Sequence, residues 1–223
     1  METKDYWIHD NKVIFKPNFK DNIDDYIDII SKYNELIFSN YDDYNITIKT
    51  NNVYCSEYDD NYKYSKFNQQ VIIPQNVTHL TFGCYFNQQV IIPQNVTHLT
   101  FGVCFNQQLN LPNIKYIKLD CNNINIIENL PNSIEEIEFG SNFNLELQNL
   151  PNSIKKISFC SYGIYDKELN CLPELVEYLE LGIKYNKKIN KFPLNLKIIK
   201  CYKHYKYIND FKNKYNVITH FML

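Results

Sequence analysis

The stretch FNQQVIIPQNVTHLTFG occupies residues 67–83, and the same 17 letters return at residues 86–102, one period of 19 residues later. Only two residues separate the copies. A period of about 20 residues is too short for a strand–helix–strand unit, but it suits a single coil of a solenoid. One such coil cannot bury its apolar side alone, whereas stacked coils share a continuous core. The two copies therefore predict adjacent coils of a repeat protein.

Prolines extend this repeat beyond the two identical copies. They are Pro74, Pro93, Pro112, Pro131, Pro151, Pro173 and Pro193, at spacings of 19, 19, 19, 20, 22 and 20 residues. Apolar residues two apart follow most of them, as in Leu80 and Phe82, and mark one face of a short strand. Proline is tolerated before a strand because it donates no ladder hydrogen bond there. Five strand residues are predicted to form a single buried column: Leu80, Leu99, Ile117, Ile137 and Ile157.

The predicted fold is a leucine-rich-repeat-like solenoid, because the period lies in the range of that repeat class. We expect a parallel β-sheet on its concave face, a mostly irregular or extended convex side, and a short helix near each end. Phe67, Phe86, Phe105 and Phe143, with Ile124 between them, should stack inside the coils. The asparagines that follow them should be buried and hydrogen-bond backbone groups of adjacent coils: Asn68, Asn87, Asn106, Asn125 and Asn144.

The repeated string resembles the FNIP repeat, a short relative of leucine-rich repeats found in amoebae and in giant viruses that infect them. The resemblance rests on Phe-Asn-Gln, the apolar-Pro step and Leu-Thr-Phe-Gly at residues 67–83 and 86–102. It is close over residues 67–159 and looser over 160–202. Several viral members carry an N-terminal F-box, but residues 1–60 lack a Leu-Pro opening followed by an F-box-like helical run, so that function is not carried over.

One continuous domain with three regions is expected. Residues 1–66 form an N-terminal capping region with divergent coils, residues 67–202 hold the repeats, and residues 203–223 form a C-terminal cap. Apolar spacing predicts a helix over residues 21–33, capped by Asp21 or Asn22, and a strand within residues 35–41. A helix at about 207–215 followed by a strand mirrors this plan at the other end. Residues 42–66 are expected to hold degenerate coils with a loop.

Composition argues against several functions. The net charge is −2 and the chain has no arginine, so a general polyanion binder is not expected. We see no signal peptide and no apolar run of the ~20 residues that a membrane span needs. Seven cysteines at irregular spacings are then expected to be reduced thiols in the cytoplasm, the host cytoplasm for a viral protein. Phosphate-binding and catalytic motifs are absent from the sequence, so neither an enzyme nor a cofactor is expected.

The outward-facing residues of the strands are the candidate partner-binding site, because such solenoids mostly offer an extended concave face. The residues five and seven positions after each proline form two outward-facing rows. The candidates are His79, Thr81, His98, Thr100, Tyr116, Lys118, Glu136, Glu138, Lys156, Ser158, Tyr178 and Glu180. Strands about 4.8 Å apart would place Lys118–Glu138, Glu136–Lys156 and Glu180–Lys200 as ion pairs. The simpler interpretation is that these charges pair with one another and that the face binds no partner.

Other chemistries have weaker support. His79 and His98 should be neighbours, but two imidazoles are too few for a metal site, and duplication explains the pair. Cys84, Cys104, Cys121 and Cys160 follow strands without a matched Cys-x-x-Cys, so packing is mostly their expected role. No metal, cofactor or catalytic residue is therefore assigned.

The rival function is nucleic-acid binding. Residues 184–214 contain ten lysines against a single acidic residue, Asp210, and interleave them with tyrosines. Lysine contacts phosphate and tyrosine can stack on bases. A solvated terminal coil explains the same composition. The sequence thus favours a non-enzymatic protein-interaction scaffold, with RNA binding through residues 184–214 as the alternative; a protein partner is expected, and membrane binding is not.

Overall fold

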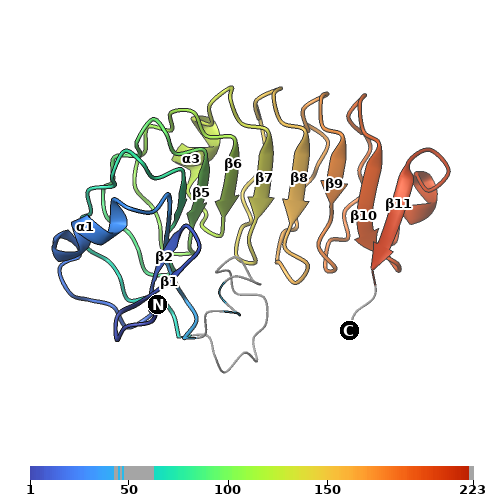
Figure 1. Ribbon diagram of the computed structural model, residues 1–223. Helices are drawn as coiled ribbons and strands as arrows, with labels where there is room; N and C mark the ends of the chain where they lie inside the picture. Colours follow the sequence, from blue (N-terminus) through green and yellow to red (C-terminus); the bar gives the residue numbers. More distant parts are fainter. Residues whose placement is uncertain (43–44, 46, 48–62, 221–223) are drawn as a thin grey trace.

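A computed structural model describes residues 1–42, 45, 47 and 63–220, and shows a β-solenoid of about ten turns (Figure 1). One 11-stranded sheet runs through it in sequence order. Its strands are β1 (Tyr6–His9), β2 (Lys12–Phe15), β3 (Glu35–Phe38), β4 (His79–Thr81), β5 (His98–Phe101), β6 (Tyr116–Leu119), β7 (Glu136–Phe139), β8 (Lys156–Phe159), β9 (Tyr178–Glu180), β10 (Ile198–Tyr202) and β11 (Asn216–His220). Each pair from β2 to β11 is parallel, so the predicted solenoid is confirmed.

The strand register follows the sequence period. Leu80 lies opposite Leu99, and Leu99 lies opposite Ile117 on the next strand. All five residues of the predicted column are at most 1% exposed. In a parallel sheet, residues at the same register point to the same side. The predicted buried column is therefore confirmed.

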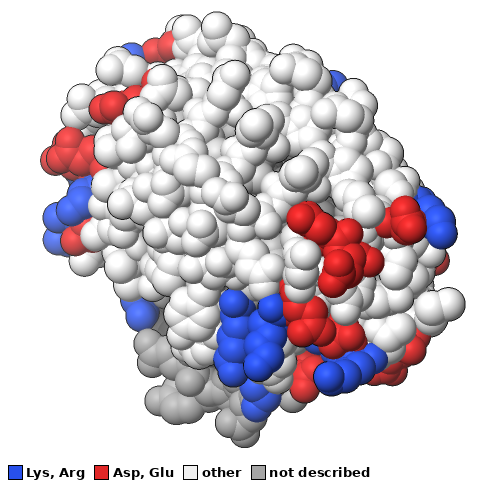
Figure 2. Space-filling view, turned by 90° about the vertical axis from the view of Figure 1, so that its left-hand side faces the viewer, with Lys and Arg blue, Asp and Glu red and all other residues white. Residues whose placement is uncertain are grey.

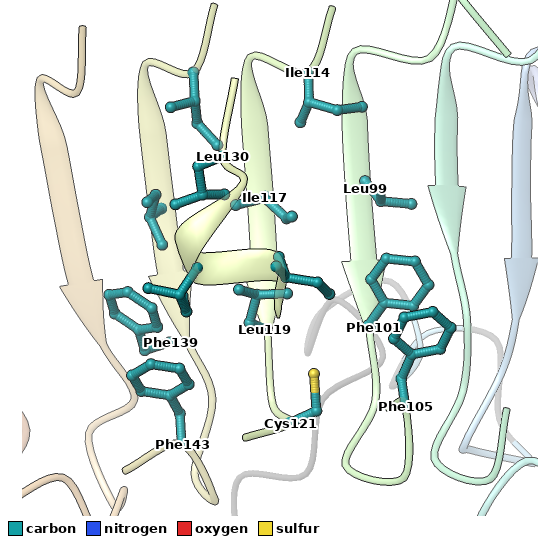
Figure 3. Packing of buried hydrophobic residues seen from close by; sticks show 14 of the residues in the cluster. Leu99, Phe101, Phe105, Ile114, Ile117, Leu119, Cys121, Leu130, Phe139 and Phe143 are labelled. Atoms are coloured by element: carbon teal, nitrogen blue, oxygen red, sulfur yellow. The ribbon is translucent and has the colours of Figure 1, made fainter. Parts of the chain in front are cut away.

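Aromatic rings fill the interior behind this column. Phe67, Phe86 and Phe105 stack along the solenoid with centroids 5.9 and 6.0 Å apart. A ring from the preceding strand packs against each, as Phe101 does against Phe105 at 3.9 Å. Figure 3 shows this pair and the equivalent pair, Phe139 and Phe143. The same pairing recurs between Phe82 and Phe86, with centroids 3.8 Å apart.

The coil that contains β6 has no ring at these positions. Leu119 and Cys121 stand between the two ring pairs, and the helix α3 (Ile124–Glu128) occupies the space that rings fill elsewhere (Figure 3). The Asn123 side chain accepts a hydrogen bond from the Asn125 N–H and caps the helix. Helical spacing turns Ile126 and Ile127 inward. Ile124 is 44% exposed, so the expectation that it stacks inside was wrong.

The asparagine ladder lies at the surface. The Asn68 Oδ1 accepts a hydrogen bond from the Asn87 N–H at 2.9 Å, and the Asn87 Oδ1 accepts one from the Asn106 N–H at 2.8 Å. Asn68 and Asn106 are exposed, and Asn87 is half-buried. The predicted side-chain bonds between coils are confirmed for Asn68 and Asn87. The predicted burial was wrong for all three residues, because the preceding phenylalanine already closes the interior.

The two ends carry different caps. At the N-terminal end, β1 and β2 form an antiparallel hairpin that the sequence analysis did not predict. The 3₁₀ helix η1 (Ile23–Tyr26) and helix α1 (Ile27–Ile30) follow it, and the Asn22 side chain caps η1. At the C-terminal end, the expected helix at about 207–215 is only the 3₁₀ turn η2 (Ile208–Asp210) before β11. The degenerate coils expected over residues 42–66 lie mostly outside the described residues.

Surface charge is absent from a long part of the repeats. No Asp, Glu or Lys occurs between Lys66 and Lys115. Figure 2, which faces the side of the molecule that carries α1, shows a broad uncharged surface bordered by acidic and basic side chains. Ile72 and Ile91, the same position in the two identical copies, are 74% and 87% exposed.

Candidate docking face on the open side of the sheet

All twelve predicted site residues lie on β4 to β9 and point away from the core. We call this side of the sheet, predicted as concave, the open face. Nine of the twelve are half-buried or exposed. Thr100, Lys118 and Ser158 are buried, at 7%, 4% and 9% exposure. These three were expected to be accessible, and the structure corrects that expectation.

Lys118 is buried because its neighbours cover it. Its Nζ pairs with a carboxylate oxygen of Glu138 on the next strand, and the Tyr116 hydroxyl donates to the other oxygen at 2.9 Å. Burial, and then the Glu138 charge, raise the pKa of Tyr116, which keeps its hydroxyl a hydrogen-bond donor. A buried charge needs such a partner. The three side chains thus form one closed network in the middle of the open face.

The remaining predicted ion pairs are present. Lys156 contacts Glu136 at 3.0 Å, and Lys200 contacts Glu180 at 2.7 Å. Exposed pairs of this kind contribute only about 0–1 kcal/mol each. The paired charges alternate in sign from one strand to the next.

An aromatic row borders this charged region. The His79 and His98 rings stack with centroids 4.0 Å apart, and His98 lies 5.6 Å from the Tyr116 ring. Each histidine Nδ1 is 2.9 Å from the hydroxyl of the threonine before it, Thr78 or Thr97. Burial lowers the pKa of both histidines, and the His79 charge lowers that of His98 further. Both rings are therefore predominantly neutral at pH 7.

Two hollows lie on the open face. The first, of about 440 Å³, is lined by the stacked histidines, Tyr116 and Thr81, and by Lys12 and Glu35 from β2 and β3. Lys12 and Glu35 pair with each other across these two strands. The sequence analysis missed both because it started the outward rows at residue 79. The alternating apolar residues of β2 and β3 could have extended the rows to them.

The second hollow, of about 590 Å³, lies toward the C-terminal end. Tyr162, Tyr178 and Phe159 supply apolar surface, while Glu138 and Lys156 form its charged side. The Tyr178 hydroxyl donates to Glu180 at 3.1 Å, and the Lys156 ammonium lies 5.8 Å from the Tyr178 ring centroid. A polar rim around aromatic surface is common in protein interfaces.

Metal and thiol chemistry gain no support from the described residues. Among them, no group of three or more His, Cys, Asp or Glu side chains could hold a metal ion. Burial raises the pKa of the Cys121 thiol to about 12 and that of Cys201 to about 11. Thiols with raised pKa values are poor nucleophiles. Cys104 is exposed, contrary to the expected packing role.

The basic segment 184–214 offers less to a nucleic acid than its composition suggested. Tyr185 and Tyr205 are only 5% exposed and stack inside the coils with centroids 6.0 Å apart. Lys188, Lys191 and Lys197 pair with acidic residues. No helix in the described parts of the chain is long and apolar enough to cross a bilayer.

Known proteins resemble this chain in sequence and in structure. Residues 67–92, 86–122 and 122–162 match the FNIP Repeat family, so the chain carries FNIP repeats over these residues. Among solved structures it is similar to CroV588 of a giant virus, whose crystal structure is described as a novel circular LRR protein structure. Identity is 22% and the TM-score 0.49; the match covers 91% of this chain and 38% of that protein. No curated protein matches the chain.

Proposed function

We propose that the FNIP repeats of this chain form a non-enzymatic scaffold that binds a protein partner in the cytoplasm through the open face of the sheet. The observation that carries the proposal is the pair of hollows on that face, each with aromatic side chains beside paired charges. Aromatic residues in such settings supply much of the binding energy of protein interfaces.

The charge pattern supports a protein as the partner. Lys118–Glu138, Glu136–Lys156 and Glu180–Lys200 alternate in sign across the five strands β6 to β10. A polyanion would meet as many carboxylates as ammonium groups on this surface. A protein surface with its own mixed charges can match such a pattern, which gives specificity more than affinity.

Affinity capture from an amoebal lysate tests the proposal. The open-face variant carries Tyr116→Ala, Lys156→Glu and Tyr178→Ala. A control variant carries Gln70→Ala, Gln89→Ala and Gln108→Ala, three side chains at the same position of successive coils away from the open face. Proteins recovered by wild type and control, and lost with the open-face variant, support the proposal.

Equal recovery by all three proteins would contradict docking on this face. Because Tyr116 belongs to the buried network with Lys118, thermal unfolding must first show that the open-face variant is folded. The milder pair Lys156→Glu and Tyr178→Ser provides the same test without touching that network. A photo-crosslinking residue at Thr81, on the rim of the first hollow, would show whether the captured protein contacts the open face directly.

A further inference from the structure

The two ends of the solenoid carry opposite charges. At the N-terminal end, Asp21, Asp24, Asp25 and Asp28 surround η1 and α1. Asp24 and Asp25 lie in η1, Asp28 lies in α1, and Asp21 precedes Asp24 by three residues, so four like charges are concentrated in one short segment. All four are exposed, and none forms an ion pair with any residue that the structure describes. We call these residues the acidic end.

The C-terminal end presents lysines. Lys206, Lys212 and Lys214 are exposed and have no carboxylate partner within the described residues, where Asp210 already pairs with Lys188. Two of the lysines lie over neighbouring rings, Lys206 over Tyr207 and Lys214 over Tyr215, each 5.2 Å from the centroid. We call these three lysines the basic end.

The strand edges at the two ends also differ. Among the described strands, β11 pairs only with β10, and Ile218 in its middle is 43% exposed. The outer edge of β1 is partly covered, because Glu2 bridges Trp7 and the N-terminal amine donates to the Ile8 carbonyl at 2.8 Å. An open sheet edge is a ready surface for association. The C-terminal end is therefore the less protected of the two.

The acidic and basic ends occupy equivalent places in their coils. The aspartates lie in the segment between the parallel strands β2 and β3, and the lysines lie in the segment between β10 and β11. Figure 1 shows α1 at one end of the solenoid and the turn before β11 at the other. If a second copy continues the stack, the last coil of one molecule faces the first coil of the next. The lysines then face the aspartates.

We propose that the C-terminal end of one copy docks on the N-terminal end of a second copy, with Lys206, Lys212 and Lys214 facing the acidic end. Contact between two like ends would bring equal charges together, which costs energy. A head-to-tail contact does not close on itself at two copies, so assemblies grow with concentration. The open face takes no part, so this inference stands or falls separately from the proposed function.

Sedimentation velocity of the full chain over a concentration series tests the proposal. At low salt, we expect the weight-average sedimentation coefficient to rise with concentration. Added salt screens charges beyond a Debye length of about 10 Å at 0.1 M. The association constant should therefore fall by roughly tenfold or more between 50 and 500 mM NaCl. A monomer at every concentration and salt would overturn the proposal.

Charge reversal identifies the two surfaces. One variant carries Asp24→Lys, Asp25→Lys and Asp28→Lys, and another carries Lys206→Glu, Lys212→Glu and Lys214→Glu. Each alone should sediment as a monomer, because both of its ends then have the same sign. Their mixture, and the variant that carries all six changes, should associate again. A control with Lys115→Glu, Lys155→Glu and Lys167→Glu has the same net charge as the second variant and should behave as wild type.

Failure of the mixture to associate would overturn the head-to-tail contact. Single-stranded RNA is the other acidic partner to examine, by fluorescence anisotropy with labelled polyuridylate. Salt-sensitive RNA binding that the Lys206, Lys212 and Lys214 reversals abolish, together with a monomeric wild type, would assign the basic end to nucleic acid and overturn self-association. Circular dichroism of each variant confirms that a loss of association does not reflect unfolding.

Discussion

The imidazole rings of His79 and His98 stack on adjacent strands with centroids 4.0 Å apart and planes 15° apart. The two residues occupy the same place in the two identical copies, and the parallel register puts them directly opposite each other. Even the hydrogen bond to the preceding threonine is repeated, at 2.9 Å in both coils. Identical sequence one period apart has produced identical local structure on the open face.

This stack predicts a loss of stability in acid. Burial holds the pKa of both histidines below the ordinary value of 6.5. The unfolded chain therefore takes up protons at a higher pH than the folded chain. The stability of the fold with both histidines neutral is fully present above about pH 6.5, and it is lost as the pH falls through the folded-state pKa values of His79 and His98. Glu35 and Glu136 oppose this effect, and Lys12 and Lys115 add to it.

Urea denaturation of wild type and of a His79→Gln, His98→Gln variant at pH 7.5 and 5 measures the effect. Other titrating groups are common to both proteins, so the difference between them reports the histidine pair. Wild type should lose more free energy of unfolding than the variant between the two pH values. An equal loss in both would show that the stack is not linked to proton uptake.

The Lys118–Glu138–Tyr116 network predicts that removal of Glu138 and removal of Glu136, two residues away on β7, lower stability by different amounts. Glu138→Ala leaves Lys118, which is only 4% exposed, without its counter-charge. We expect a loss of about 1–3 kcal/mol in the free energy of unfolding, because a buried charge is left unpaired. Glu136→Ala breaks only an exposed pair and should cost about 0–1 kcal/mol. Equal effects in chemical denaturation would contradict the burial of Lys118.

Position 102 requires glycine because the backbone of the preceding coil lies too close for a side chain. A Cβ atom at this position would lie 2.5 Å from the Gly83 carbonyl oxygen, which is part of the backbone and cannot move freely. Gly102→Ala should therefore lower the free energy of unfolding by about 1–3 kcal/mol. At Gly163 the nearest atom would be 3.1 Å away, so Gly163→Ala should cost less. The reverse order in thermal or chemical unfolding would contradict the stacking of these coils.

The stacked aromatic rings predict that truncation of one ring lowers the free energy of unfolding strongly. Phe101 is fully buried, with neighbouring rings 5.5 Å away at Phe82 and 3.9 Å away at Phe105. Phe101→Ala should cost about 3–5 kcal/mol, since it removes buried area and leaves a cavity. Ile91→Ala, at a position 87% exposed, should stay within about 0.5 kcal/mol of wild type. A cost below 1 kcal/mol for Phe101→Ala would show that the column is not packed.

Much of the fold followed from the sequence because one short pattern recurs. The spacing of two residues between apolar positions such as Leu80 and Phe82 recurs from coil to coil. It predicted the position of each strand and the side of the strand that faces the core. The paired charges of Glu136 and Lys156 followed from the strand register alone. Each of these inferences depends only on residues within one coil or at the same place in the next coil.

The sequence was less informative where a coil departs from the repeated pattern, and where contacts between side chains determine whether a residue is exposed. Asn123 caps a helix that displaces Ile124 from the interior, and the two identical copies at residues 67–83 and 86–102 contain no such helix. Burial of Lys118 depends on side chains of Tyr116 and Glu138 that meet only in three dimensions. The hairpin of β1 and β2 lies outside the repeat, so the period could not predict it.

Methyl–methyl nuclear Overhauser effects in a protein labelled at Ile, Leu and Val methyl groups test the central claim most directly. The account predicts successive cross-peaks from Leu80 to Leu99, Leu99 to Ile117, Ile117 to Ile137, and Ile137 to Ile157, because these residues are register partners on adjacent parallel strands. The two identical copies would be distinguished by single substitutions at Leu80 and Leu99. Absence of the cross-peaks between register partners, in a folded protein whose methyl groups are assigned, would contradict one parallel strand per proline-marked coil.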